Sequence, residues 1–427
     1  MQMGTRKVSE APNWEKLWWG SPPLEGPHGR QAHSMVDWSE GESLVVFGGV
    51  DADTNVLDEL WLYNYSETNQ NENRWEEGGI NSSTGAEPVF GHTATIWPSM
   101  QKMVVFGGAW RQSNGAFTTS GGHLVRVLDL QTMSWTALEP GGASVPRARV
   151  DHEAVIYNDS LYVYGGIDID QSELLGDLWR YDLDQGTWEL LYEPEPMLSN
   201  VSPGPFARAG MAACLLDARL VMYGGQDEWQ TLSDIWAYDL AGEEGWAEGG
   251  LDDPWSYPRS YHSLVCHGGY LWSFGGLERV YSGGNQYYLF AYSSLHAHIG
   301  LNGGPWLQHA EAETSVSPRY DHAACVSQHG LLYVYGGRLQ DVSDSNDLLV
   351  LDVQQLEPHL EKAPPDPSHA AGTELGGSLT LVNLAVLAAL VCSCCCFGLS
   401  YWHLRRRAAL QLRLNEGQLL AALGGGG

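Results

Sequence analysis

The stretch Leu44-Val45-Val46-Phe47-Gly48-Gly49 decides the fold, because its pattern returns five more times along the chain. Each copy is an apolar run that suits a buried β-strand and ends in a pair of glycines. The six pairs are Gly48-Gly49, Gly107-Gly108, Gly165-Gly166, Gly224-Gly225, Gly275-Gly276 and Gly336-Gly337. Successive pairs are 59, 58, 59, 51 and 61 residues apart. Recurrence at a nearly fixed period indicates a repeat architecture.

Three further elements accompany the glycine pairs in a fixed order. An Arg-x-x-His motif precedes most pairs, although Val89 replaces its arginine in the second copy and Met211 replaces its histidine in the fourth. A strand with two different faces follows the pair; its copies include Leu60–Tyr63, Leu178–Asp182, Ile235–Asp239 and Leu289–Tyr292. A fourth strand carries one tryptophan: Trp75, Trp135, Trp188, Trp246 or Trp306. We therefore expect four strands per unit, with these tryptophans in the core.

The sixth unit has no tryptophan strand of its own, and the N-terminus offers a replacement. Trp14 lies 34 residues before Gly48, a spacing close to the 29 to 36 residues found in the other units. We expect the segment around Trp14 to complete the last unit and close a ring. A closed ring leaves no unpaired sheet edge that would favour aggregation.

These motifs, in this order, are those of the kelch repeat, and the chain resembles the kelch β-propeller family over about residues 10–357. The resemblance implies an all-β fold: a six-bladed propeller closed by the N-terminal strand, with one four-stranded sheet per blade around a central channel. The units exceed the usual kelch length of about 50 residues. We expect the excess in loops that carry binding specificity.

Charge and composition restrict the classes of partner. The chain has 22 Lys and Arg against 52 Asp and Glu, a net charge of −30. Nucleic acid is excluded as an expected partner, because binding phosphates requires positive charge. The acidic excess has two interpretations, which are solubility and recruitment of a basic protein partner.

A membrane anchor is predicted near the C-terminus. Residues 379–402 form an uncharged, mostly apolar stretch that is long enough to cross a bilayer as a helix. Arg405, Arg406 and Arg407 follow it directly, whereas the preceding linker, 358–378, is acidic and rich in Pro and Gly. Basic flanks stay cytoplasmic. We thus expect a single-pass protein with an N-terminal extension at 1–9, a lumenal or extracellular propeller, and a short cytoplasmic tail at 403–427.

Two features bear on this topology. Four Asn-x-Ser/Thr sequons, which begin at Asn64, Asn81, Asn158 and Asn200, are candidate glycosylation sites on a lumenal domain. Residues 1–14, in contrast, contain no apolar stretch of the kind found in a signal peptide. One interpretation is that the secretory leader precedes this sequence. The alternative is a tail anchor that leaves the propeller in the cytosol.

The seven cysteines fall into two groups. Cys214, Cys266 and Cys325 occupy equivalent places in the first strands of three units, and we expect them to pack in the core as free thiols. The other four, Cys392, Cys394, Cys395 and Cys396, lie toward the arginine end of the predicted span. Of these, Cys394, Cys395 and Cys396 are candidates for palmitoylation.

No catalytic motif accompanies the repeats. The recurrent histidines and arginines have the same place in separate units, so we assign them structural roles, the arginines as donors to loop carbonyls between blades. Some kelch-type propellers are enzymes, including copper oxidases of the galactose oxidase kind. No copper or iron site of those relatives can be assembled from this sequence, and we expect no cofactor, no metal and no catalytic residue. A carbohydrate-active or carbohydrate-binding ectodomain remains the alternative, together with a cytosolic tail-anchored adaptor.

A binding face is the expected functional site. Kelch modules usually dock partners on the loops that follow the glycine pairs. In this chain those loops hold acidic residues and two tryptophans, which suit a basic peptide through charge pairing and cation-π contact. The candidate residues are Asp51, Trp110, Asp168, Asp170, Asp227, Glu228, Trp229, Glu278 and Arg338. We predict a membrane-anchored kelch propeller that binds a protein partner without catalysis.

Overall fold

The computed structural model describes most of the predicted propeller. The described residues are 13–18, 26–65, 75–78, 87–119, 124–141, 144–194, 204–242, 244–249, 257–283, 286–301, 306–308 and 316–362. The predicted span at 379–402, its candidate palmitoylation sites, and the sequons at Asn81 and Asn200 lie outside these residues. Within the described part, no helix combines the length and the apolar character needed to cross a membrane.

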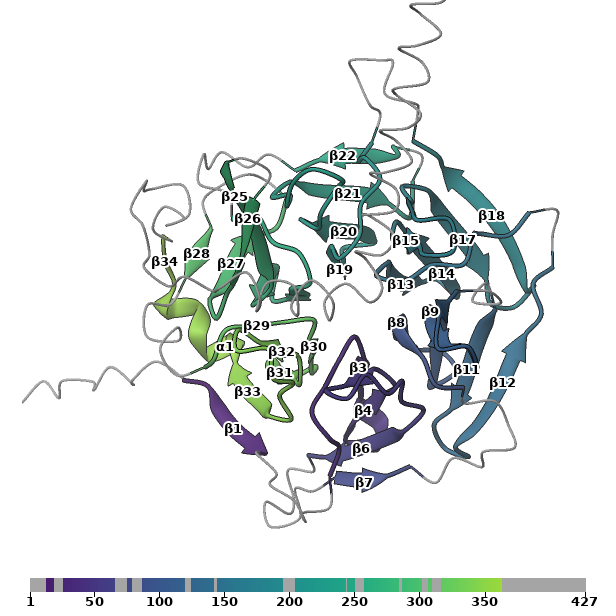
Figure 1. The fold of residues 1–427 in the computed structure, drawn as a ribbon, viewed down its shortest axis with the longest axis horizontal. Helices are drawn as coiled ribbons and strands as arrows, with labels where there is room; N and C mark the ends of the chain where they lie inside the picture. Colours follow the sequence, from purple (N-terminus) through teal and green to yellow (C-terminus); the bar gives the residue numbers. More distant parts are fainter. Residues whose placement is uncertain are drawn as a thin grey trace, which may run out of the picture.

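Six sheets surround a central channel, as predicted (Figure 1). In chain order the blades are β3–β4–β6–β7 (Ser34–Trp38, Ser43–Phe47, Leu60–Asn64, Trp75–Glu77), β8–β9–β11–β12 (Phe90–Trp97, Lys102–Arg111, Val125–Asp129, Ser134–Leu138), β13–β14–β17–β18 (Glu153–Tyr157, Ser160–Tyr164, Leu178–Asp182, Thr187–Tyr192), β19–β20–β21–β22 (Ala212–Leu216, Arg219–Tyr223, Ile235–Asp239, Trp246–Glu248), β23–β24–β27–β28 (Ser263–His267, Tyr270–Phe274, Leu295–Ile299, Leu307–Gln308) and β30–β31–β33–β1 (Ala323–Val326, Leu331–Tyr335, Leu348–Asp352, Glu15–Trp18). The first strand of each blade lines the channel.

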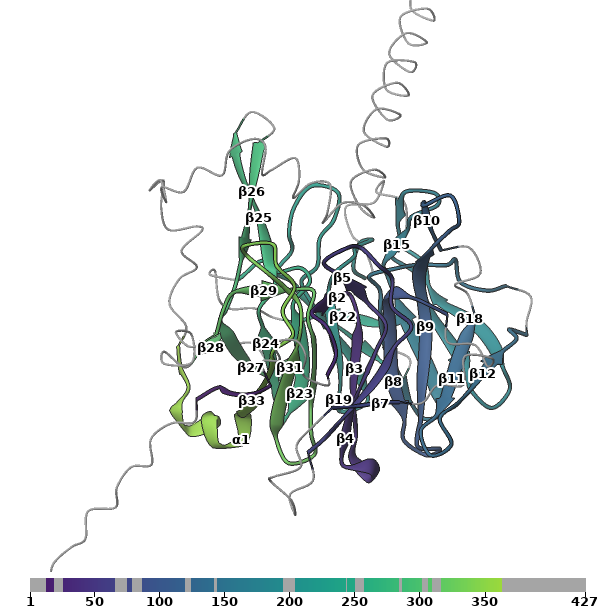
Figure 2. The ribbon, with the colours of Figure 1, turned by 60° about the horizontal axis from the view of Figure 1, so that its bottom comes forward.

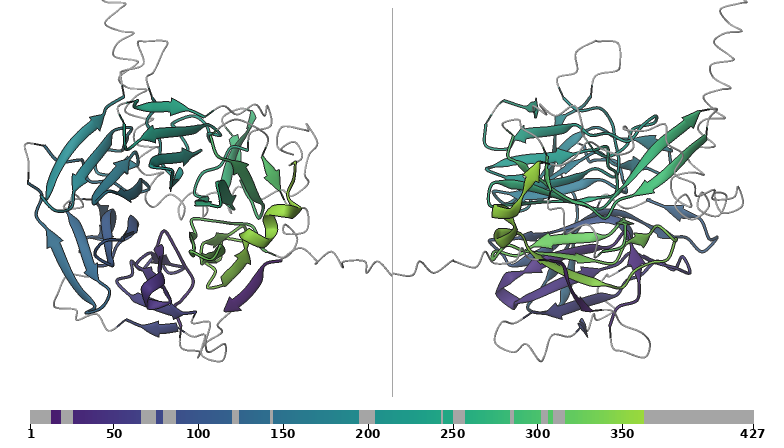
Figure 3. Two further views of the ribbon diagram at one scale, coloured as in Figure 1. Left: turned by 180° about the vertical axis from the view of Figure 1, so that it is seen from behind. Right: turned by 90° about the vertical axis from the view of Figure 1, so that its left-hand side faces the viewer.

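The N-terminal strand closes the ring, which confirms the closure prediction. β1 pairs antiparallel with β33, with Glu15 opposite Val350. Figure 3 shows this purple strand beside the yellow-green strands of the sixth blade. Trp14 packs against Phe274, with ring centroids 4.8 Å apart, and is buried between blades five and six. The tryptophans of the other fourth strands are buried as well, as predicted.

The glycine pairs are required because the next blade approaches them closely. The second glycine of each pair donates its N–H to the next blade; Gly49 reaches the carbonyl oxygen of Val89 at 2.8 Å. Gly337 reaches Arg30 of the first blade at 2.8 Å, so these contacts run around the whole ring. Gly48 has a φ of +67°, and a Cβ there would lie 2.5 Å from the Val89 oxygen. Another side chain would therefore push neighbouring blades apart.

The recurrent arginines hold each blade together. Their guanidinium groups donate to the carbonyl of the first glycine in the same blade, as Arg149 does to Gly165 at 2.9 Å. In four blades they also bind a carboxylate just before the third strand: Arg30–Glu59, Arg149–Asp177, Arg208–Asp234 and Arg319–Asp347. The second blade, which has Val89 instead, uses Arg126 of its third strand to reach Gly107 at 3.4 Å. The predicted contacts with carbonyl oxygens are confirmed, but they lie within a blade and not between blades as expected, and the contacts with carboxylates were not predicted.

The fifth blade departs from the prediction in its third strand. We expected Leu289–Tyr292 there, but the strand is β27, Leu295–Ile299. The predicted segment instead belongs to β26 (Gln286–Ala291), which pairs with β25 (Leu277–Gly283) in a long hairpin. β27 reads Leu-His-Ala-His-Ile and lacks the Trp-x-Tyr-Asp signature, so the only aromatic-x-Tyr match fell on the hairpin. A short strand after the last blade, β34 (Glu361–Lys362), adds to β28.

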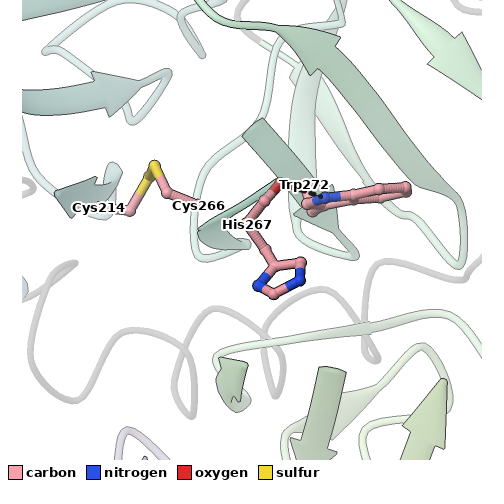
Figure 4. Close-up of a disulfide and its surroundings, with 4 residues drawn as sticks. All are labelled: Cys214, Cys266, His267 and Trp272. Atoms are coloured by element: carbon pink, nitrogen blue, oxygen red, sulfur yellow. Dashed lines mark hydrogen bonds between the residues drawn. A yellow bond between two sulfur atoms is a disulfide. The ribbon is translucent and has the colours of Figure 1, made fainter. Parts of the chain in front are cut away.

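Two of the three propeller cysteines form a disulfide, so the prediction of free thiols was wrong for them (Figure 4). Cys214 of β19 is bonded to Cys266 of β23, and the Cα atoms are 5.7 Å apart. Their places are not equivalent, because Cys214 is the third residue after Met211 whereas Cys266 is the fourth after His262. Alternate residues of a strand point to opposite faces, so this offset turns the two thiols toward each other. Cys325 has the parity of Cys214 and packs with the first blade as a free thiol.

Candidate functional site

The loops that follow the glycine pairs gather at one end of the propeller, here called the Gly-pair face. Several of them form short antiparallel pairs, three as hairpins and two with the segment that leads into the first strand of the same blade. These are β2–β5 (Arg30–Gln31, Val50–Asp51), β9–β10 (Lys102–Arg111, Phe117–Thr118), β15–β16 (Ile167–Asp168, Glu173–Leu174), β25–β26 and β29–β32 (Arg319–Tyr320, Arg338–Leu339). Figure 2 shows β25, β26, β10, β15, β2 and β5 in the upper part of the molecule and α1 (Val353–Leu356) at the lower side. The structure thus places the predicted loops on a common face.

Four of the predicted carboxylates shape the loops of this face. Each accepts hydrogen bonds within its own loop or from the neighbouring one: Asp51 from Asn55 N at 2.8 Å, Asp168 from Gln171 N at 3.0 Å, Asp170 from Thr119 Oγ1 at 2.9 Å, and Asp227 from Trp229 N at 2.7 Å. Asp170 is solvent-exposed, whereas Asp168 is buried. These side chains hold the loops in shape and leave part of their negative charge at the surface.

Two other predicted residues are buried. The Glu278 carboxylate accepts a hydrogen bond from the Tyr292 hydroxyl at 2.5 Å inside the fifth blade. Arg338 pairs with Asp344 through its Nε atom, 3.0 Å from Oδ1, and both side chains are almost fully covered. Neither residue presents its charge to solvent, so both support the face from within.

The two predicted tryptophans differ in exposure. Trp110 is half-buried on β9, opposite Thr118 of β10. Trp229 has 54% of its surface exposed, and half-buried Glu228 precedes it. They belong to the second and fourth blades, which are not neighbours in the ring. Trp229 is therefore the aromatic side chain of this set that a partner would meet first.

The β25–β26 hairpin projects from the Gly-pair face (Figures 2 and 3), and hydrogen bonds connect it with the loop of Trp229. Arg279 of this hairpin donates its backbone N–H to Thr231 Oγ1 at 3.0 Å and its Nη2 to Gln226 Oε1 at 3.0 Å. Gln226 in turn donates to the Tyr261 hydroxyl at 3.2 Å, which donates to Asp151 Oδ2 at 3.2 Å. A hydrogen-bonded path therefore connects the hairpin with the channel axis.

A chamber of about 120 Å³ lies where the channel meets this face. Its rim consists of the third residues of the six Arg-x-x-His positions, all with positive φ: Ala32, Gly91, Asp151, Gly210, Tyr261 and Asp321. Backbone N–H···O=C bonds of 2.7 to 3.1 Å join these six residues in a complete circle. Below the rim the channel continues as a larger cavity of about 570 Å³.

Three carboxyl groups and several histidines line the chamber, and burial shifts the pKa values of two of these carboxyl groups and of the histidines toward their neutral forms. Burial raises the pKa of Asp321 to about 8, and the negative charge of Asp151 adds to this effect. Burial also raises the pKa of Glu153, the first residue of β13, to about 8. Burial lowers the pKa of His92 to about 3, and the pKa of His152 falls well below its usual value. No Lys or Arg lines the chamber among the residues that the structure describes.

Sequence reasoning missed this chamber, although its residues lie inside the main motif. The variable positions of Arg-x-x-His were treated as spacers, and a comparison of the six third positions would have revealed two aspartates and a tyrosine at one level of the ring. In the same described part of the chain, no group of three or more His, Cys, Asp or Glu side chains is arranged to hold a metal ion.

The fold is a six-bladed propeller, and loops form its Gly-pair face. Comparison with known proteins identifies the family of this propeller. The family model described as the KLHDC2/KLHL20/DRC7 Kelch-repeats domain matches residues 9–191 and 91–298. The chain therefore belongs to the kelch-repeat family. The solved structure of YjhT is similar in fold, with a TM-score of 0.60 and 14% sequence identity over 80% of this chain and 99% of that one.

Several curated relatives match this chain over part of their own length. An F-box/kelch-repeat protein of Arabidopsis thaliana is 26% identical over 73% of this chain and 66% of its own length. Kelch domain-containing protein 3 of Bos taurus is 27% identical over 48% of this chain and 51% of its own length. An N-(sulfonatooxy)prop-2-enimidothioate sulfolyase of Thlaspi arvense is 25% identical over 47% of this chain and 56% of its own length. The chain thus spans about half to two thirds of the length of these relatives.

Proposed function

We propose that this chain is a membrane-anchored kelch propeller that binds a basic protein partner, without catalysis, through its Gly-pair face. Kelch propellers are typically protein-interaction modules. The observation that carries the proposal is Trp229, which is 54% exposed on a loop of that face. A large exposed aromatic side chain is typical of interaction hot spots. The net charge of −30 and exposed carboxylates such as Asp170 favour a partner of opposite charge.

The anchored topology has support from the sequence and from the propeller. Residues 379–402 and the three arginines after them predict a span with a cytoplasmic tail. The disulfide between Cys214 and Cys266 favours an oxidising compartment for the propeller, such as the secretory lumen or the cell exterior. Palmitoylation of Cys394, Cys395 and Cys396 near the cytoplasmic boundary remains part of the proposal.

The last described strand runs away from the Gly-pair face. β24 runs toward the Gly-pair face, because its end is followed by Gly275-Gly276. Its antiparallel neighbours alternate in direction, so β34 runs toward the opposite end. The linker to the predicted anchor thus starts toward the end of the propeller that faces away from the proposed partner.

Replacing Trp229 with alanine is expected to weaken binding of basic peptides by at least about tenfold, because a hot-spot aromatic contributes more than about 2 kcal/mol. The peptides would be selected from a phage-displayed library of random short sequences against the full chain in nanodiscs, and affinities would be measured by fluorescence anisotropy. Leu215→Ala is the matched control, since Leu215 is 39% exposed near the opposite end of β19. Equal losses for both variants, or selected peptides without enriched Lys and Arg, would contradict the proposed face.

Asn64 and Asn158 are expected to carry N-linked glycans when the chain is made in a eukaryotic secretory host. Both residues are exposed, at the end of β6 and in the turn between β13 and β14. Asn64→Gln and Asn158→Gln should each remove one glycosidase-sensitive increment of mass. Asn114→Gln, at an exposed Asn outside any sequon, should leave the mass of the glycans unchanged. Unmodified sequons on a propeller that cytosolic protease digests would establish the tail-anchored alternative.

A further inference from the structure

A covalent bond joins the fourth and fifth blades at the wall of the channel. Cys214 of β19 and Cys266 of β23 both line the cavity of about 570 Å³ below the rim. Cys214 is buried, and Cys266 is half-buried. Among the residues that the structure describes, no other disulfide joins two blades. This bond is therefore a chemically distinct link in the ring, and it lies beside a cavity large enough for a small thiol.

The disulfide lies where a repeated polar contact between blades is missing. At three other interfaces, a histidine nitrogen lies 2.9 to 3.0 Å from a hydroxyl of the preceding blade: His92–Ser34, His152–Thr93 and His322–Ser263. The fifth blade has His262 in this place, but the fourth blade offers Ala212 instead of a hydroxyl. Neither ring nitrogen of the buried His262 has a partner in the described part of the chain. Cys214 follows Ala212 by two residues on the same side of β19, so the disulfide links these blades where the hydrogen bond is absent.

The interface between the sixth and first blades shows the same place without a disulfide. Cys325 has the place in β30 that Cys214 has in β19, and it lines the same cavity. The place of Cys266 is taken there by Asp37 of β3. Burial raises the pKa of the Cys325 thiol, and the negative charge of Asp37 adds to this effect. Cys325 is thus a matched thiol that faces a carboxylate instead of a second sulfur.

The two linked blades carry the most prominent features of the Gly-pair face. The loop of Trp229 follows β20 of the fourth blade, and the β25–β26 hairpin follows β24 of the fifth blade. Arg279 of the hairpin donates its backbone N–H to Thr231 Oγ1 and its Nη2 to Gln226 Oε1, both at 3.0 Å. Hydrogen bonds weaken steeply when the donor and the acceptor move apart. The disulfide therefore helps to fix the spacing of blades on which these contacts depend.

We propose that the Cys214–Cys266 bond is a redox-sensitive control of the Gly-pair face, and that a small thiol in the channel weakens partner binding by reducing this bond. The inference rests on the proposed function and names its regulation. The oxidised form is the one that binds the partner. The reduced propeller keeps the backbone contacts between the two blades, such as the bond from Gly225 N to the Arg259 oxygen at 2.7 Å, so it stays folded.

The chemical step is thiol–disulfide exchange. A thiolate of the reductant attacks one sulfur atom, forms a mixed disulfide with that cysteine and releases the other cysteine. A second thiol of the reductant then attacks the mixed disulfide and releases the first cysteine. Overall, two thiols of the reductant lose two electrons and two protons and become a disulfide, while Cys214 and Cys266 gain them and become thiols.

Peptide binding by the full chain in nanodiscs, with and without dithiothreitol as the reductant, provides the first test. The probes are the basic peptides selected against the oxidised chain. Reduction is expected to weaken their binding at least about fivefold, the lower end of the usual range for coupling between two sites. Affinity should return when dithiothreitol is removed and oxidised glutathione restores the bond. Mass spectrometry of alkylated peptides verifies the state of the two cysteines.

Two variants and one measurement of folding control this test. Cys214→Ala combined with Cys266→Ala should bind as weakly as the reduced chain and should not respond to dithiothreitol. Cys325→Ala should respond as the wild-type chain does. Tryptophan fluorescence should remain that of the folded propeller during reduction. If dithiothreitol reduced the bond only when the propeller unfolded, the inference would be overturned.

Hydrogen exchange provides a second readout that needs no partner. Amides in the segments 226–232 and 277–280 should exchange at least about fivefold faster in the reduced chain, whereas those of β10 in the second blade should not change. If peptide binding depends on Trp229, unchanged affinity after reduction would overturn the inference and leave the proposed function intact. If peptide binding does not depend on Trp229, the proposed function fails and exchange alone decides. Faster exchange in the two segments would then support the control by the disulfide, and unchanged exchange would overturn it.

Discussion

Asp177→Ala is expected to lower the free energy of unfolding by about 3–5 kcal/mol, because it leaves a buried guanidinium without its counter-charge. Arg149 has 0% of its side chain exposed, and its Nη1 and Nη2 atoms donate to the two oxygens of Asp177 at 2.8 and 3.0 Å. Trp179 Nε1 also donates to this carboxylate at 2.6 Å. One substitution therefore removes the acceptor of two buried donor groups within the third blade.

The comparison with an exposed ion pair isolates the effect of burial. Glu189→Ala removes the partner of Arg180, 2.7 Å away, but both side chains are about half exposed. This change should cost less than about 1 kcal/mol. Urea unfolding followed by tryptophan fluorescence measures both variants, and similar midpoints for them would show that the Arg149–Asp177 pair is not a principal stabilising contact.

The same pair predicts a loss of stability in acid. Burial tends to raise the pKa of Asp177, but hydrogen bonds and the positive charge of Arg149 outweigh it and hold this pKa below its usual value. The folded state therefore favours the ionised carboxylate. Its contribution is present above the unfolded pKa, about 3.9, and is lost as the pH falls through the lower folded value. The difference in unfolding midpoint between the wild-type chain and Asp177→Ala should shrink over that range.

The overall fold was predictable because the repeated residues make the contacts between blades. Gly48 and Gly49 recur where the backbone of the next blade approaches within hydrogen-bonding distance, so their spacing counts the blades. Trp14 was recognisable as part of the last blade because a tryptophan strand was missing there. Because the blades pack in the same way around the ring, one recognised motif predicts the same structural feature in six places.

The structural details that were predicted wrongly or missed lie where one copy of the repeat departs from the common motif. In the fifth blade no carboxylate precedes the third strand, and Arg259 instead donates to Ser294 Oγ at 2.6 Å and contacts His296 Nδ1 at 2.7 Å. Without the usual signature, Tyr292 was assigned to the wrong strand. The chamber was missed for a related reason, because it forms only when six variable positions meet on the axis. The motif was compared among its six copies only at its recurrent residues, so the side chains at these positions were not considered together.

Removing the disulfide is expected to lower the free energy of unfolding by about 4 kcal/mol. Cys214 and Cys266 are 52 residues apart in the sequence, and the chain-entropy model assigns about this value to a loop of that length. The bond joins the innermost strands β19 and β23, so it also fixes the fourth blade to the fifth. The double variant Cys214→Ala with Cys266→Ala should unfold at a clearly lower urea concentration.

Cys325→Ala is the control for this prediction, since Cys325 faces the first blade and burial raises the pKa of its thiol. It should cost no more than about 1 kcal/mol, the effect of removing a small, partly buried group. Peptide mapping without reduction should recover the peptides of Cys214 and Cys266 joined, with Cys325 alkylated only after unfolding. Three alkylated propeller thiols in protein isolated from its native source would contradict both the bond and the proposed oxidising compartment, because a thiol pair at this separation stays reduced only where the surroundings are reducing.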